Sequence, residues 1–171
     1  MAADPFQNLV QAPLSDFGQM FLTCKTAFRY ESLPAYLVES EAKALEAYLQ
    51  TGTCKIDFNA EWHDVLLQAQ ARGAHFRRVR LLSDPLSVYE RFETACGYPP
   101  NREQGEDIRT IGVHDSSDIA LPTNIPDFWL FNNDTCYLMR YDEPGVFLGV
   151  YLVPAQAYEE FAEMLWQKAT P

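Results

Sequence analysis

Charged side chains recur inside apolar segments of this chain, and the first such segment is His75-Phe-Arg-Arg-Val-Arg80. Alternation along a strand places Arg78 and Arg80 on one face and Arg77 on the other. An arginine that is covered by a helix must find an acceptor. The segment therefore indicates either solvated arginines on an edge strand or an arginine that binds a carboxylate or phosphate at the carboxyl end of the sheet, where open α/β sheets bind ligands.

A second charged segment carries Glu106 and Arg109, which are three residues apart in an expected strand. They point to opposite faces and cannot pair with each other, so each needs a partner on another element. Arg80 is a candidate partner for Glu106, and Glu93 or Asp127 for Arg109. An internal ion-pair network that fixes strand order is the alternative to a binding site here.

A third segment, Asp127-Phe-Trp-Leu-Phe131, begins with an acid and continues as a strongly apolar strand. It is either a solvent-facing acid followed by core aromatics or a site carboxylate beside an aromatic wall, an arrangement typical of ligand pockets. The candidate ligand-binding residues of the chain are Arg78, Arg80, Glu93, Glu106, Arg109, Asp127 and Trp129.

Signatures of catalysis and of metal binding are absent from the sequence. It has no G-x-S-x-G, no Walker loop and no G-x-G-x-x-G. His114-Asp115, in a long polar segment, could supply a base, but a loop histidine is more often simply solvated. The cysteines and histidines show no zinc spacing, so we expect no metal, no cofactor and free buried thiols at Cys24, Cys54, Cys96 and Cys136.

The chain is acidic, with a formal net charge of −11 over 171 residues, of which −9 falls in residues 86–171. Such a surface disfavours direct nucleic-acid binding and suits a basic partner or a cationic ligand. No apolar run reaches the ~20 residues of a membrane span, and the start of the chain lacks the features of a signal peptide. We therefore expect a cytoplasmic protein with no membrane contact.

The apolar periodicity predicts an N-terminal arm over residues 1–14 and one α/β domain over 15–171. A helix from Ser15 or Asp16 is expected to carry one stripe of Phe17, Phe21, Cys24 and Phe28. Further helices are predicted over 36–49, ending at Gly52, from Asn59 to Gly73, over 85–95 with Asp84 as N-cap, and from Pro154. Strands are predicted over 74–82, 106–113, 128–131, 135–141 and 146–153, with irregular segments over 97–105 and 114–126. The strand over 146–153, apolar on both faces, is expected to be central and covered on both sides.

The order of several motifs resembles an uncharacterised actinobacterial family, described only as a domain of unknown function, over residues 15–170. Many of its members look like neighbours of helix-turn-helix regulators. The motifs are Arg78-Val-Arg80, Ser83-Asp-Pro85, Tyr89-Glu-Arg-Phe-Glu93, Gly105-Glu-Asp-Ile-Arg109, Leu121-Pro122 and Asp127-Phe-Trp-Leu-Phe131.

The family is in turn similar to one half of the phospholipase D architecture, which implies a mixed central sheet flanked by helices. In the His-x-Lys-x-x-x-x-Asp motif of that superfamily, Asp127 stands at the histidine, Trp129 at the lysine and Asp134 at the aspartate. Without the histidine no phosphohistidine intermediate can form, so the likeness implies a degenerate member without phosphodiesterase activity.

Two functions follow as hypotheses. The preferred one is a non-catalytic regulatory domain that binds a small anionic or zwitterionic ligand or a partner protein, accessory to a helix-turn-helix regulator or to a natural-product locus. A homodimer is left open. The competing hypothesis is an accessory enzyme of natural-product biosynthesis that uses Glu106 or Asp127, with a pKa raised by burial, together with His114.

Overall fold

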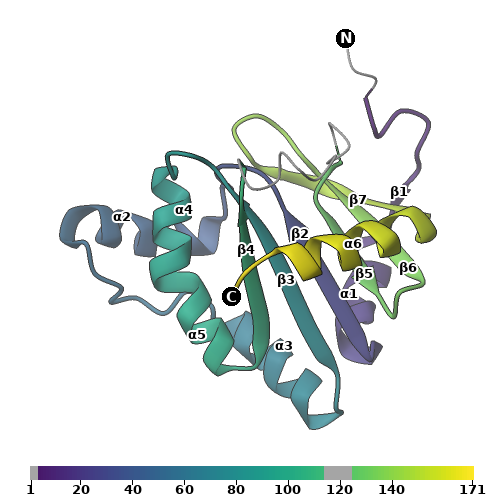
Figure 1. Cartoon of the computed structure of the whole chain (residues 1–171). Helices are drawn as coiled ribbons and strands as arrows, with labels where there is room; N and C mark the ends of the chain where they lie inside the picture. Colours follow the sequence, from purple (N-terminus) through teal and green to yellow (C-terminus); the bar gives the residue numbers. More distant parts are fainter. Residues whose placement is uncertain (1–3, 114–124) are drawn as a thin grey trace.

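The computed structural model describes residues 4–113 and 125–171. Its central feature is one seven-stranded sheet in the order β1-β7-β6-β5-β2-β3-β4 (Figure 1). The predicted layered α/β fold with a mixed sheet is confirmed. The strands are β1 (Gln11–Ala12), β2 (Thr26–Glu31), β3 (His75–Leu82), β4 (Glu106–Gly112), β5 (Phe128–Phe131), β6 (Thr135–Tyr141) and β7 (Phe147–Pro154).

Only β2, β3 and β4 run parallel to one another, and the other pairings in the sheet are antiparallel. Parallel neighbours need crossover connections, which helices supply here. The helices are α1 (Leu14–Thr23), the 3₁₀ turn η1 (Glu39–Glu41), α2 (Ala42–Thr51), α3 (Ala60–Ala71), α4 (Val88–Phe92), the π-helical turn η2 (Glu93–Gly97), α5 (Tyr98–Glu103) and α6 (Gln156–Lys168).

Helices cover both faces of the sheet. Helices α1 and α3 pack on one face, where Phe21, Leu66 and Phe131 belong to one apolar cluster. Helix α6 packs on the other face, where Phe128 and Leu165 belong to a second cluster, and it crosses the sheet in Figure 1. Strands buried by helices on both sides can carry apolar residues on both, as β5 does.

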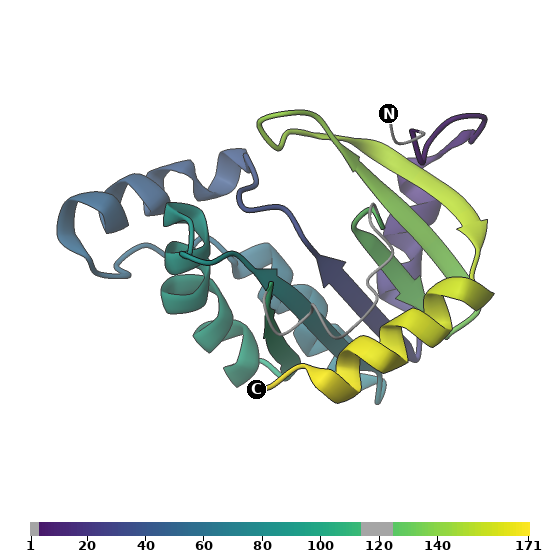
Figure 2. The same cartoon turned by 45° about the horizontal axis from the view of Figure 1, so that its top comes forward.

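A third apolar cluster lies away from the middle of the sheet, where Tyr36 and Ala44 meet Tyr89 and Phe92 of α4. Figures 1 and 2 both place the run α4-η2-α5 beside β4 and α2 outermost. Ser87 is the N-cap of helix α4, and its side chain and that of Glu90 form a reciprocal capping box. The predicted N-cap at Asp84 is therefore wrong, because Ser87 offers the hydroxyl that accepts from the Glu90 amide.

The first predicted helix is too long, because the chain turns at Cys24 and enters β2. Phe28 consequently lies on a strand and packs against the face opposite to α1. Residues 97–105 were predicted as an irregular loop, but most of them form α5, in which a proline occupies the first turn. A proline there loses no helical hydrogen bond, so the two prolines allow a helix.

Several local predictions are confirmed. Gly52 ends α2 with a φ of 67° and donates its N–H to the carbonyl of Tyr48. Asn132 and Asn133 have φ values of 53° and 59° in the turn between β5 and β6, a conformation that asparagine tolerates.

The prediction of a central, doubly covered strand over 146–153 is wrong. Strand β7 lies next to the edge of the sheet, between β6 and the two-residue β1, and its Leu152 is 54% exposed.

Two of the four cysteines are joined, which corrects the prediction of four free thiols. Cys54 and Cys96 form a disulfide between the segment after α2 and the turn η2, whereas Cys24 and Cys136 are free and buried. The two bonded residues are 42 positions apart. A bond that closes a loop of this size restricts the unfolded chain considerably.

Reduction of this disulfide should lower the free energy of unfolding by about 2–4 kcal/mol, because it releases the unfolded chain from the closed loop. Chemical denaturation with and without a reductant measures the change. In a Cys54→Ser variant the reductant should have no effect. Equal stability of the oxidised and reduced wild type would contradict the prediction.

Candidate functional site

Three arginines and five carboxylates are buried together at the carboxyl-terminal half of β2 and β3. We call this set the buried ion network, and its members are Arg29, Glu31, Arg78, Arg80, Glu90, Glu93, Glu106 and Asp127. Arg29 and Glu31 on β2, and Arg78 and Arg80 on β3, point to the sheet face that α3 covers. The parallel register pairs Arg29 with Arg78. Two adjacent buried guanidinium groups repel each other unless carboxylates lie between them.

Arg78 holds the middle of the network. Its Nε donates to Glu106 Oε1 and its Nη1 donates to Glu31 Oε1, and each donor–acceptor distance is 2.8 Å. The other oxygen of Glu106 accepts a hydrogen bond from the indole Nε1 of Trp62 at 2.9 Å. This bond connects α3 to β4. Arg29 also reaches Glu31, with 3.3 Å between Nε and Oε1.

Asp127 forms a second branch of the network. Its Oδ1 accepts from the amide and the hydroxyl of Ser32 at 2.9 and 2.7 Å, and its Oδ2 accepts from the Tyr36 hydroxyl. Arg29 approaches Oδ2 at 3.4 Å. Burial raises the pKa of Asp127, although Arg29 and these hydrogen bonds oppose the change.

Arg80 forms the third branch and is fully buried. Its Nη1 donates to the Tyr36 hydroxyl at a distance of 3.3 Å. Its Nε lies 3.3 Å from Glu93 Oε2, but the geometry is not that of a hydrogen bond. Nη2 is 4.0 Å from Glu90 Oε1. Arg80 thus donates one hydrogen bond within the described chain, while its Nε and Nη2 lie near carboxylates without forming one.

Two of the glutamates near the arginines, Glu31 and Glu93, differ in ionisation. Burial alone would raise the pKa of Glu31, but Arg78 and Arg29 outweigh it and lower this pKa to about 2. Burial, reinforced by the charge of Glu31, raises the pKa of Glu93 to about 8 despite the nearby Arg80. Glu31 is therefore ionised at neutral pH, and Glu93 largely keeps its proton.

A cavity of about 190 Å³ opens onto the network between the start of α3 and the run η2-α5. We call it the Glu93 cavity. Oε2 of Glu93 is buried and accepts no hydrogen bond within the described chain. Arg78 also lines the cavity, and its Nε and Nη1 donate to Glu106 and Glu31. The residues that carry its chemistry are Glu41, Asn59, Trp62, Arg78, Glu93 and Tyr98.

The comparison with known families is decisive for classification. The family model of the Domain of unknown function (DUF6879) matches residues 15–171. The chain belongs to this family. No curated protein matches the chain. The matched range contains every residue of the buried ion network and of the Glu93 cavity, so both features lie within the domain that defines the family.

Most of the candidate residues converge, and one does not. Arg78, Arg80, Glu93, Glu106 and Asp127 all join the network, but Arg80 pairs with Glu93 and Arg78 takes Glu106. Trp129 is buried beside Arg29, whose guanidinium carbon lies 5.6 Å from the ring centroid.

Arg109 lies on the opposite face of the sheet, as the parity of β4 requires. Its guanidinium stacks on Trp166 of α6 at 4.0 Å, and its Nη1 donates to the carbonyl of that residue. The proposed partners Glu93 and Asp127 are on the other face, so those pairings are wrong. Arg77 also contacts Trp166, with its guanidinium carbon 4.9 Å from the centroid of the ring.

The sequence did not reveal three members of the network, Arg29, Glu31 and Glu90, or Tyr36, whose hydroxyl bonds both Asp127 and Arg80. Arg29 and Glu31 were hidden by the overlong first helix, and Tyr36 was assigned to the second helix. The available signal was the alternation in Thr26-Ala-Phe-Arg-Tyr-Glu31, which sets aromatic and charged residues on opposite faces with a period of two.

The three positions aligned with the phospholipase D motif do not meet in space. Asp127 precedes β5, Trp129 lies within that strand, and Asp134 is exposed in the turn after it, where Thr135 donates to its side chain. Within residues 4–113 and 125–171, no three histidine, cysteine or carboxylate side chains are placed to hold a metal ion. The candidate base His114 lies outside the described residues.

The described chain contains no helix long and apolar enough to cross a bilayer.

Proposed function

We propose that this domain is a non-catalytic binding domain that takes a small zwitterionic molecule into the Glu93 cavity. One observation carries the proposal. In the cavity, Glu93 brings a buried carboxylate oxygen that accepts no hydrogen bond, although Arg80 Nε lies 3.3 Å from it, and Arg78 brings a guanidinium whose Nε and Nη1 are already bonded to Glu106 and Glu31. Buried polar groups are normally satisfied, so the Glu93 oxygen favours a ligand that supplies a donor, and Arg78 on the same lining can bind an acceptor on that ligand.

The chemistry of the cavity selects the ligand class. An ammonium group beside Glu93 would supply the missing donor and favour the ionised carboxylate, and a ligand carboxylate beside Arg78 would supply an acceptor. Trp62 and Tyr98 give aromatic walls, which attract a cation and bury an apolar stem. A free amino acid or a similar amino-carboxylate has all three parts.

A purely anionic ligand is less well supported. The network holds five carboxylates against three arginines, so an added anion meets an excess of negative groups. The acid–base enzyme hypothesis is also less well supported, since the protein itself occupies both oxygens of Asp127 and both of Glu106.

A regulatory role accessory to a helix-turn-helix regulator, or to a natural-product locus, rests on the resemblance of the motif order alone. The relation to a degenerate phospholipase D half rests on the same ground. A binding domain without a nucleophile–base pair is compatible with both.

Filling the cavity should abolish binding. Gly97 lines it with an ordinary φ, and a Cβ built there meets Glu93 Cγ at 3.6 Å and Phe58 Cζ at 3.7 Å, which is normal van der Waals contact. Gly97→Leu therefore adds a side chain to the cavity without backbone strain. We expect at least a tenfold loss of affinity for the tightest binder among the free amino acids, measured by calorimetry.

Gly18→Leu is the matched control, because Gly18 also lies in a helix, α1, and a Cβ there meets nothing within 4 Å. It should bind as the wild type does. The N-acetylated form of the same amino acid should not bind, since it lacks the ammonium group. Absence of binding by every amino acid, or equal binding by Gly97→Leu with its fold intact by circular dichroism, would refute the proposal.

A further inference from the structure

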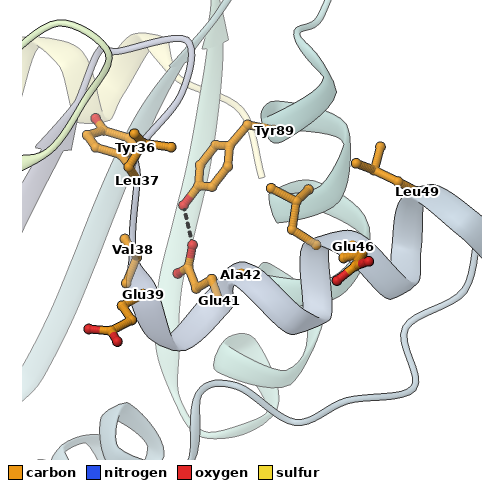
Figure 3. A pocket seen from close by; sticks show the side chains of 10 residues that line it. Tyr36, Leu37, Val38, Glu39, Glu41, Ala42, Glu46, Leu49 and Tyr89 are labelled. Atoms are coloured by element: carbon orange, nitrogen blue, oxygen red, sulfur yellow. Dashed lines mark hydrogen bonds between the residues drawn. The ribbon is translucent and has the colours of Figure 1, made fainter.

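An apolar groove of about 460 Å³ lies on the outermost helix of the molecule, separate from the sheet. It is bounded by the extended segment that leads into η1, by α2 and by Tyr89 of α4 (Figure 3). Leu37, Val38 and Leu49 line it and are 53%, 42% and 59% exposed. Single exposed apolar residues are ordinary on a protein surface, but several that line one hollow indicate a site of contact.

The rim of the groove is acidic. Glu39, Glu41 and Glu46 line it, and no lysine, arginine or histidine is among its lining residues. Glu41 accepts from the Tyr89 hydroxyl over 2.7 Å, whereas Glu39 and Glu46 are exposed. The groove thus combines an apolar floor with three glutamates on its lining, within a chain whose net charge is −11.

We propose that this groove docks a basic amphipathic helix of a partner protein. Leu45 and Leu49 are one turn apart on α2 and form a ridge beside Leu37 and Val38. A helix with apolar residues on one face packs into such a groove through anchors at i, i+3 or i+4, and i+7. Lysines or arginines that flank those anchors would meet Glu39 and Glu46.

A second copy of this chain is a poorer occupant. The groove of each copy would meet a strongly acidic partner, and like charges across an interface oppose association. A neutral apolar ligand would leave the rim without counter-charge. Charge complementarity therefore commits the groove to a basic segment.

This proposal is independent of the Glu93 cavity. The two sites share Glu41 but otherwise have different lining residues. Filling the cavity at Gly97 should leave docking unchanged, and blocking the groove should leave amino-acid binding unchanged. Either proposal can consequently fail while the other stands.

The test uses a synthetic amphipathic helical peptide with leucines on one face and lysines on the other, followed by fluorescence anisotropy with the full chain. Leu49→Asp should weaken its binding at least tenfold without loss of fold, since Leu49 is already mostly exposed. A joint Glu39→Gln and Glu46→Gln variant should bind more weakly and depend less on salt.

Leu67→Asp is the matched control, because Leu67 is a 49% exposed leucine on α3 that lines no part of the groove. It should bind the peptide as the wild type does, and a peptide with glutamates in place of the lysines should not bind. Equal binding by the wild type and Leu49→Asp would overturn the proposal in favour of diffuse charge attraction. Failure of the basic peptide to bind, or a self-associated state that Leu49→Asp disperses, would also overturn it.

Discussion

Replacement of Arg78 by methionine should lower the free energy of unfolding by about 3–5 kcal/mol at neutral pH. Arg78 joins Glu31 and Glu106 with two 2.8 Å contacts, and all three side chains are at least nine-tenths buried. Methionine has a similar length but no charge. The variant would leave two buried carboxylates without their nearest cation, which is the costly way to break a buried ion pair.

Arg91→Met is the control, since Arg91 is exposed on α4 and outside the network. It should change stability by less than about 1 kcal/mol, as is usual for surface positions. Addition of Glu31→Gln to Arg78→Met should recover part of the loss, because it removes one uncompensated charge. Urea denaturation of the four proteins measures these effects. A loss below about 1 kcal/mol for Arg78→Met would mean that the network is not a stabilising element.

The stability of the protein should fall as the pH rises from about 4.5 to about 8, and Glu93 should be the main cause. Its folded pKa of about 8 lies above the ordinary value of 4.5, so the folded chain holds the proton more tightly than the unfolded chain. The stability that this group contributes is fully present below pH 4.5 and is lost as the pH rises through 8. One such group gives at most about 1.4 kcal/mol per pH unit.

Glu31 acts in the opposite sense at lower pH. Its folded pKa of about 2 lies below 4.5, so its contribution is present above pH 4.5 and is lost as the pH falls toward 2. The two glutamates together predict a maximum of stability near pH 5.

Urea denaturation at pH 5 and pH 8 tests this profile. Glu93→Gln should remove most of the difference between the two pH values, because glutamine mimics the protonated acid and cannot ionise. Glu160→Gln, at an exposed position on α6, should preserve the wild-type difference. An unchanged pH profile in Glu93→Gln would show that other groups control the titration.

Local periodicity was enough to predict much of the charged site. Alternation in β3 correctly separated Arg78 and Arg80 from Arg77, and the parity of β4 correctly separated Glu106 from Arg109. These predictions succeed because the direction of a side chain in a strand depends on position alone. The partners of these residues could not be predicted. Arg29, Glu31 and Tyr36 come close to β3 only because β2 pairs with β3 across a long crossover connection, so the contacts join segments that are distant in the sequence.

The cavity and the disulfide could not be predicted from the sequence either, because both depend on residues whose side-chain directions the local periodicity does not determine. Trp62 lies in the helix predicted from Asn59 to Gly73, but that prediction does not indicate that its indole N–H donates to Glu106. Glu93 and Cys96 both lie on η2, a π-helical turn that no sequence motif predicts. The spacing of residues along a regular α-helix gives no guide to where such a turn directs them.

The indole N–H signal of Trp62 gives the most direct test of the proposed binding function. Trp62 lines the Glu93 cavity, whereas Trp166 lies on the far face of the sheet and serves as an internal reference. In a nitrogen–proton correlation spectrum, titration with the free amino acids should shift the Trp62 signal to saturation, leave Trp166 unmoved, and have no effect on Gly97→Leu. A Trp62 signal that no amino acid moves, or that moves equally in Gly97→Leu, would contradict the binding of a zwitterion in this cavity.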